Sequence, residues 1–397
     1  MATNNIEQGL TPEPNITPSP VDAELDALDK GDGTENIYVA PQWKLMWWKF
    51  RKHKLALISG IVLIILYLVA IFADFVAPYN PEAFFQQYTL APPSRIHLSN
   101  AQGGFEGPFV YGIKRGRDPV TLRPIFVEDQ TIIHHIRLFN RGTPYKLWGF
   151  IDTDIHLFGL DVPQDEQGFF LLGADRLGRD IFSRVVIGSR ISLSIGLVGV
   201  FMSLIFGIIL GGISGYYGGV ADNIIQRMIE FVRSVPSIPL WMALSAALPP
   251  NWPVVWVYFG ITVILSLIGW TGLARVVRGR FLALREEDFV LAARLVGSSE
   301  MRIILRHMVP SFLSYIIATL TLAVPGMILA ETGLSFLGLG LRAPAISWGV
   351  LLQEAQNLRS VALAPWVLLP GLAVVLSVLA FNFLGDGLRD AADPYSR

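Results

Sequence analysis

The chain has 397 residues, of which 52% are hydrophobic and only 16% are charged, whereas soluble domains carry about 25% charged residues. This composition excludes an ordinary soluble domain and indicates an integral membrane protein. The formal net charge is −1, and the sequence has no dense basic run with interleaved aromatics, so no nucleic-acid partner is expected. The absence of cysteine excludes disulfides, cysteine nucleophiles and thiolate metal sites.

The N-terminal part predicts a tail and one membrane span. Residues 1–43 are polar, rich in Pro, Asn, Asp and Glu, and lack an apolar run, which predicts a disordered cytoplasmic tail rather than a signal peptide. Within the segment 44–79, a basic and tryptophan-rich cluster precedes an apolar run at residues 55–77, whose one charge is Asp74. Basic residues and Trp beside a span mark its cytoplasmic end, so the N-terminus is expected inside.

Residues 80–171 precede the next long apolar run and are therefore expected on the opposite side of the membrane. Short β-prone pieces at 108–113, 124–127, 136–139 and 146–151 predict a small extracytoplasmic β-rich insertion. Four of the six histidines of the chain lie in it, namely His97, His134, His135 and His156. Adjacent histidines of a strand point to opposite faces, so we favour polar surface over a metal site and expect no metal or cofactor.

Five further apolar runs predict an all-α membrane protein of about six transmembrane helices that carries the β-rich insertion. They lie at about residues 191–213, 224–248, 254–273, 312–329 and 361–384. In the first of these and just beyond its end, glycines 207, 211 and 215 form a small-residue stripe suited to close helix packing. Pro236 and Pro239 are expected to kink the second. Residues 172–385 thus form the transmembrane domain, and residues 386–397 form a cytoplasmic C-terminal tail.

The loop at 276–310 begins in an arginine cluster that places it in the cytoplasm. Ala292, Ala293 and Gly297 put three small residues within about one and a half turns of a predicted helix. The charged side chains of this stretch include Arg294, Arg302 and Arg306. A helix with a small-residue face can lie close against another protein, whereas the alternative is an ordinary solvated loop.

Two further sets of polar residues border predicted spans. The run before the second span contains Gly173, Asp175, Gly178, Arg179, Asp180, Ser183, Arg184, Gly188 and Arg190. Read locally, this run predicts a Gly-rich turn into a helix capped at Asp180, with Arg179 and Arg184 paired nearby. Glu331, at the end of the fifth span, has two alternative roles, which are lining a transport path and forming a structural salt bridge or cap.

Four blocks of the sequence resemble the permease subunits of dipeptide and oligopeptide ABC importers, in the second-permease type. The blocks are LGADRLGRDIFSRVVIGSRISL from residue 172, LAARLVG from 291, ETGLSFLGLG with SWG between 331 and 349, and LRDAADP from 388. Leu291 stands where the family usually has glutamate, and Ala174 stands where it usually has threonine. The resemblance covers about residues 44–79 and 172–397 and implies the ABC importer permease fold.

The resemblance also implies partners and a location. They are a second homologous permease, two ATP-binding subunits and an extracytoplasmic solute-binding protein, all at the lipid bilayer of a bacterial inner membrane, with both termini cytoplasmic. Ala292, Ala293 and Gly297 would then dock on an ATP-binding subunit, with the three arginines of that stretch as candidate charged contacts.

The sequence contains no Walker A, GxSxG or HExxH motif, so no catalytic residue is expected, and ATP hydrolysis is expected in the partner subunits. Peptides are the favoured substrate, with oligosaccharides or nickel chelates as alternatives. Two other classes remain open, an ion-coupled secondary transporter and a membrane scaffold.

Overall fold

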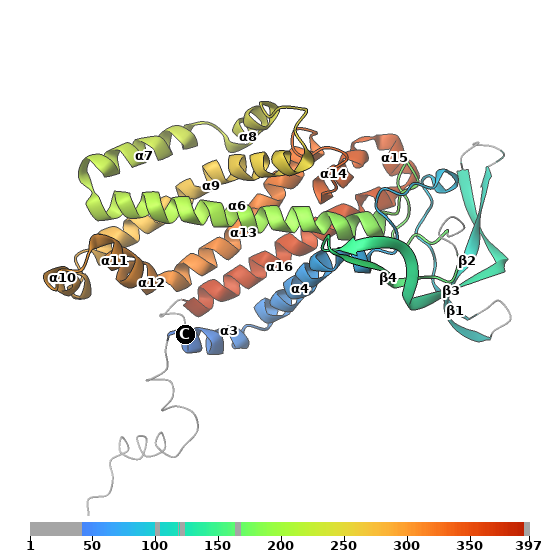
Figure 1. Cartoon of the computed structure of the whole chain (residues 1–397), viewed down its shortest axis with the longest axis horizontal. Coiled ribbons are helices and arrows are strands. Elements are labelled where there is room, and N and C mark those ends of the chain that lie inside the picture. The colour runs from blue at the N-terminus through green and yellow to red at the C-terminus, as the bar shows by residue number, and fades with distance from the viewer. Residues whose placement is uncertain (1–41, 100–103, 118, 120–123, 163–167, 393–397) are drawn as a thin grey trace, which may run out of the picture.

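The computed structural model describes residues 42–99, 104–117, 119, 124–162 and 168–392. The predicted disordered tail at 1–43 therefore lies almost entirely outside the described residues, and so do the last five residues of the predicted C-terminal tail. The described chain is an elongated bundle of helices with a β-sheet at one end (Figure 1).

The helices of ten or more residues are α3 (Gln42–Lys52), α4 (Lys54–Ile71), α6 (Ile181–Tyr217), α7 (Gly219–Ser234), α8 (Ser237–Ala246), α9 (Val254–Leu284), α13 (Leu313–Phe336) and α16 (Leu369–Ala392). The longest of these, α6, α9, α13 and α16, run roughly side by side in the bundle (Figure 1). Shorter helices connect them: α5 (Ala73–Val76), η1 (Gln86–Tyr88), α10 (Asp288–Leu295), α11 (Glu300–Ile303), the π-helical η3 (Ile304–Met308), α12 (Val309–Ser311), α14 (Trp348–Leu352), η4 (Gln353–Gln356), α15 (Leu358–Leu363) and η5 (Pro365–Leu368).

Five of the described helical segments are long and apolar enough to cross a membrane, where the sequence predicted six spans. The predicted span at 224–248 is divided between α7 and α8. Val235, which precedes Pro236, is extended (φ −92°, ψ 132°) because the proline ring disfavours the helical conformation of its predecessor. The predicted kink is thus a break between two helices. Neither helix is counted among the five spans, because α7 carries charged residues along its length and α8 is only 10 residues long.

The glycine stripe of α6 brings this helix close to α9. A Cβ atom added at Gly211 would lie 2.5 Å from the carbonyl oxygen of Ala274, and one added at Gly215 would lie 2.6 Å from the Cβ of Phe281. These separations leave no room for a side chain, so the two helices pack backbone against backbone. The packing role predicted for the stripe is confirmed, and α9 runs on to Leu284, past its predicted end at residue 273.

The insertion contains a four-stranded antiparallel sheet in the order β1-β2-β3-β4. The strands are β1 (His97–Ser99), β2 (Phe105–Arg117), β3 (Pro124–Leu147) and β4 (Ile151–Leu160). Strand β3 is one continuous 24-residue strand, where the sequence predicted three short pieces. Its first half pairs with β2 and its second half pairs with β4, so backbone hydrogen bonds support it along its whole length.

The four histidines of the insertion are spread over the sheet. His97 lies 3.3 Å from the carboxylate of Glu128, and His156 is buried, with its ring nitrogens 2.6 Å from the Ala77 carbonyl oxygen and 3.1 Å from that of Thr143. Among the described residues, no group of three or more His, Cys, Asp or Glu side chains is arranged to hold a metal ion.

The two ends of the bundle differ in what they present (Figure 1). Helix α3, the described C-terminal end and helices α10 to α12 lie at one end, which we call the terminal end. The sheet lies at the other end, which we call the sheet end, together with α14 and α15. The segment that resembles a coupling loop is therefore separated from the insertion by the length of the bundle.

The contact between α6 and α9 predicts a position-specific response to a larger side chain. We expect Gly211→Val to lower the stability of the detergent-solubilised protein by about 1–3 kcal/mol or more, because the added atoms meet the α9 backbone. The measurement is the midpoint of thermal unfolding. Gly279→Val is the matched control in α9, since a Cβ there meets nothing within 4 Å. Because valine has a somewhat higher helix propensity than glycine, this variant should change the stability by less than about 1 kcal/mol. Equal losses from both variants would contradict the packing role.

Candidate functional site

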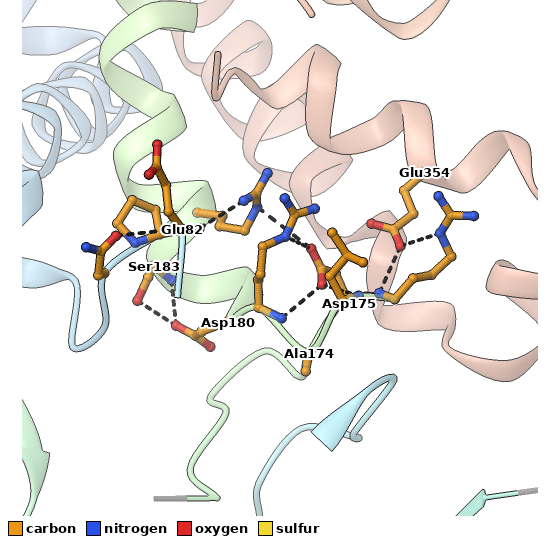
Figure 2. A network of polar contacts seen from close by, with 12 residues as sticks. Glu82, Ala174, Asp175, Asp180, Ser183 and Glu354 are labelled. Carbon is orange, nitrogen blue, oxygen red and sulfur yellow. Dashed lines mark hydrogen bonds and ion pairs between the residues drawn. The ribbon is translucent and has the colours of Figure 1, made fainter. Parts of the chain in front are cut away.

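The run before α6 folds into a tight polar turn organised by one carboxylate (Figure 2). Asp175 is buried, and its Oδ1 accepts hydrogen bonds from the backbone N–H groups of Leu177 (2.8 Å) and Arg179 (2.9 Å). Its Oδ2 accepts from the Arg179 Nε at 2.6 Å. An aspartate that bonds to the backbone ahead of it closes a turn, and the charge of Arg179 compensates the buried carboxylate.

Two glycines of this run are required by backbone geometry. Gly173 and Gly178 have φ angles of +83° and +77°, a region that favours glycine. A Cβ at Gly178 would clash with the carbonyl oxygen of Phe85, and one at Gly173 would lie 2.5 Å from Trp366. Trp366 also donates from Nε1 to the Ala174 carbonyl oxygen at 3.0 Å. The turn is therefore clamped between an upstream loop and the start of the last span.

Asp180 caps α6, as the sequence predicts. Its Oδ2 accepts from the backbone N–H of Ser183 at 2.7 Å and from the Ser183 hydroxyl at 2.6 Å. The Ser183 hydroxyl oxygen in turn accepts from the Tyr79 backbone N–H at 3.2 Å. Burial raises the pKa of Asp180 to about 6, although the hydrogen bonds from Ser183 act in the opposite direction.

The arginines of the run connect it to other parts of the chain. Arg184 donates to the Pro81 carbonyl oxygen at 2.9 Å and lies 4.0 Å from Asp175, so its principal partner is not the local one predicted for it. Arg190 makes a two-pronged contact with Asp74, at 3.0 and 2.7 Å, which joins α6 to α5. The sequence analysis missed Arg176, which pairs with Glu354 of η4 at 2.9 Å.

Gly188 is the remaining glycine of the motif and packs against the backbone of Ser347, where a built Cβ would lie at 3.4 Å, an ordinary contact distance. Every motif residue thus serves a turn, a cap or a contact between segments far apart in sequence. We interpret the run as the junction that fixes α6 against the chain before and after it.

Glu331 is enclosed in the bundle. It is fully buried, and its Oε1 accepts from the hydroxyls of Ser335 (2.8 Å) and Ser347 (2.7 Å). Ser192 of α6 donates to its Oε2 at 3.4 Å. One carboxylate therefore joins α13, α6 and the residue that caps α14. These partners are serine hydroxyls, and Glu331 takes part in none of the salt bridges found among the described residues. Its role in lining a path stays a prediction.

The coupling-loop residues lie on α10 and just beyond it. Ala292 and Arg294 are exposed and Ala293 is half-buried. The sequence analysis expected Gly297 to lie within the helix. In the structure it lies outside, directly after the C-terminal cap, with φ +79°. The N–H of Gly297 bonds to the Arg294 carbonyl, and that of Ser298 bonds to the Ala293 carbonyl, which is the Schellman arrangement that ends helices at glycine. A Cβ at Gly297 meets nothing within 4 Å, so glycine is needed there for its conformation and not for space.

The terminal end also carries apolar side chains in water-accessible positions. Leu295 is 88% exposed and Val296 is 85% exposed, at the tip of α10. The exposed apolar residues around them include Phe289, Met301 and Leu305. We call these five residues the α10–α11 apolar surface. Arg302 and Arg306 are exposed beside it, whereas the Arg294 guanidinium lies 5.1 Å above the Tyr216 ring. Two apolar residues directly before a helix-ending glycine were the signal that the sequence analysis overlooked.

Comparison with known proteins gives matches along most of the chain. Residues 204–397 match the family described as the binding-protein-dependent transport system inner membrane component, and residues 41–93 match the N-terminal TM domain of oligopeptide transport permease C. The oligopeptide transport system permease protein OppC of Haemophilus influenzae is 40% identical over 247 residues, covering 62% of this chain and 76% of that protein. The glutathione transport system permease protein GsiD of Escherichia coli is 32% identical over 357 residues, covering 90% of this chain and 91% of that protein.

A solved structure gives a weaker match. The inward-facing MetNI methionine ABC transporter aligns with 18% identity and a TM-score of 0.40, covering 53% of this chain and 97% of that chain.

The buried cap of α6 predicts a pH dependence. Because the folded-state pKa of Asp180 lies above its ordinary value of 3.8, its contribution to stability is complete at low pH and is lost as the pH rises to 6. We expect the wild type to lose about 2 kcal/mol of unfolding free energy more than Asp180→Asn between about pH 4 and pH 6. Thermal unfolding at both pH values measures this difference. Asp152→Asn, at an exposed carboxylate, is the control and should follow the wild type. A wild-type pH profile parallel to that of Asp180→Asn would contradict the burial effect.

Proposed function

Because the chain belongs to the family of binding-protein-dependent transport system inner membrane components, we propose that it forms half of the membrane path of an ATP-driven importer for di- or oligopeptides. The peptide substrate is supported by the names of the relatives, one of which transports oligopeptides and another glutathione, itself a small peptide. The residues that match the oligopeptide permease description cover α3 and α4.

The observation that carries the coupling part of the proposal is the α10–α11 apolar surface. Leucine and valine side chains exposed at a tip that projects from the bundle (Figure 1) are typical of a surface that a partner covers. The sequence has no Walker A motif, which supports assigning ATP hydrolysis to separate subunits. We assign this surface to an ATP-binding subunit, with the small Ala292 and Ala293 allowing close approach and Arg302 and Arg306 at its rim.

The arrangement of the two ends supports the orientation of the chain. Helix α3 combines Trp and basic residues at the terminal end, which is the pattern of a cytoplasmic boundary. We therefore place both termini and α10 to α12 in the cytoplasm, and the sheet on the outer side where a solute-binding protein delivers substrate. A second permease would complete the path, and closure of the ATP-binding subunits would drive alternating access.

Docking at the α10–α11 apolar surface predicts a selective loss of partners. Leu295→Glu should weaken the binding of the ATP-binding subunits by about 2 kcal/mol, which is a roughly 30-fold increase in the dissociation constant, because it puts a charge into a buried contact. The measurement is the yield of ATP-binding subunits that copurify with the solubilised chain. Leu358→Glu replaces an equally exposed leucine (85%) at the sheet end and should leave the yield unchanged. Full recovery of partners with Leu295→Glu would remove α10 from the interface.

The substrate assignment is tested by uptake. Cells that lack this chain should lose uptake of a labelled tri- to pentapeptide and regain it with the wild-type chain, but not with Leu295→Glu. A labelled oligosaccharide and a nickel chelate serve as comparison substrates. If uptake of the oligosaccharide or the nickel chelate requires the chain, and peptide uptake is the same with and without it, the peptide assignment is rejected and the permease role is retained.

A further inference from the structure

The turn between β3 and β4 is built from apolar residues, although a hairpin turn is normally rich in Gly, Asn and Asp. Residues 147–151 read Leu-Trp-Gly-Phe-Ile and contain no charge. Trp148 is 48% exposed and Phe150 is 72% exposed. The nearest charges, Lys146 and Asp152, pair with each other 3.7 Å apart, just behind the turn. Apolar side chains exposed at a turn in this way are typical of a surface that lies against an apolar or interfacial environment.

The turn lies against the end of a membrane-spanning helix. Trp148 donates from its indole Nε1 to the carbonyl oxygen of Ile71, the last residue of α4, at 2.9 Å. Its ring centroid lies 5.3 Å from that of Phe72. A second aromatic contact, between Phe139 of β3 and Phe75 of α5, has a centroid distance of 6.1 Å. The hairpin is thus attached at the level where α4 ends.

The exposed face of α4 leads to this turn. The outward side chains of α4 are apolar and follow helical spacing: Ile58, Ile61, Ile64, Ile65, Leu68 and Ile71. Beyond them lies an apolar groove of about 320 Å³ lined by Leu68, Val69, Phe72, Phe75 and Val76. The aromatic turn therefore continues the surface that α4 presents to lipid.

We propose that the β3–β4 turn is an interfacial anchor, with Trp148 and Phe150 seated among the lipid headgroups at the sheet end of α4 and acyl chains filling the adjoining groove. Trp suits this depth because its ring is apolar and its N–H is polar. The N–H groups of Gly149 and Phe150 bond to the carbonyls of Lys146 (3.2 Å) and Leu147 (3.3 Å), which lowers the cost of leaving water. Lys146 is long enough to reach lipid phosphates. The proposal requires only that α4 crosses the bilayer and does not depend on the substrate.

The lack of cysteine allows a direct test with single labels. The full chain is reconstituted in bilayers of mixed zwitterionic and anionic phospholipid, with a nitroxide at Phe150→Cys or, as the control, at Phe105→Cys. Phe105 is 80% exposed and begins β2, within the same sheet. Collision rates are measured by electron paramagnetic resonance with oxygen, which concentrates in lipid, and with a water-soluble nickel chelate. If Phe150→Cys does not fold, Ile151→Cys replaces it, since this side chain is also exposed.

The expected result is a several-fold excess of oxygen over nickel collisions at position 150 and the reverse at position 105. A nickel excess at both positions would place the turn in water and overturn the proposal. Low collision rates with both reagents at position 150 would show that another protein covers the turn, and this outcome would overturn it as well.

Discussion

The short polar turn before α6 fixes the geometry of the sheet end of the molecule. A buried carboxylate is costly unless charge and hydrogen bonds compensate it, and Asp175 has both, from Arg179 and from two backbone N–H groups. The same turn receives Trp366 and Glu354 from the C-terminal third of the chain. Removing one partner of a buried pair such as Asp175 and Arg179 costs about 3–5 kcal/mol. The contacts of Trp366 and Glu354 join this turn, and with it the first residues of α6, to the chain at the start of the last span.

The length of α6 explains why this polar junction is compatible with a membrane. A helix of 37 residues is about 55 Å long at 1.5 Å per residue, whereas the hydrocarbon core is about 30 Å thick. One or both ends of α6 must therefore extend beyond it, and the first ten residues contain Arg184 and Arg190, which have carbonyl and carboxylate partners outside the apolar core of the bundle. Between the ends, the glycine stripe lets α6 and α9 run together toward α10, so that both ends of the bundle belong to one packed body.

The sequence allowed five of the spans, the Asp180 cap and the packing role of the glycine stripe to be predicted, because each depends on local composition or spacing. The predicted third span is divided into α7 and α8, because hydropathy does not register that Pro236 disfavours the helical conformation at Val235. The role of Gly297 was misread because a small residue looks the same in sequence whether it provides space or a positive φ. The exposure of Leu295 and Trp148 could not be predicted, since it depends on which surfaces the remaining chain covers.

The central claim is that the two ends of the bundle face opposite sides of the membrane, with energy coupling at α10 and substrate delivery at the sheet. Labelling with a membrane-impermeant maleimide tests it most directly, because single cysteines at Leu295 and Phe105 are introduced into a cysteine-free chain. The vesicles come from cells that lack the ATP-binding subunits, so that no partner covers position 295. In right-side-out vesicles we expect rapid labelling at position 105 and protection at position 295, and in inverted vesicles the opposite. Labelling of both positions from the same side would contradict the claim, and the reverse pattern would invert the orientation and remove α10 from the cytoplasm.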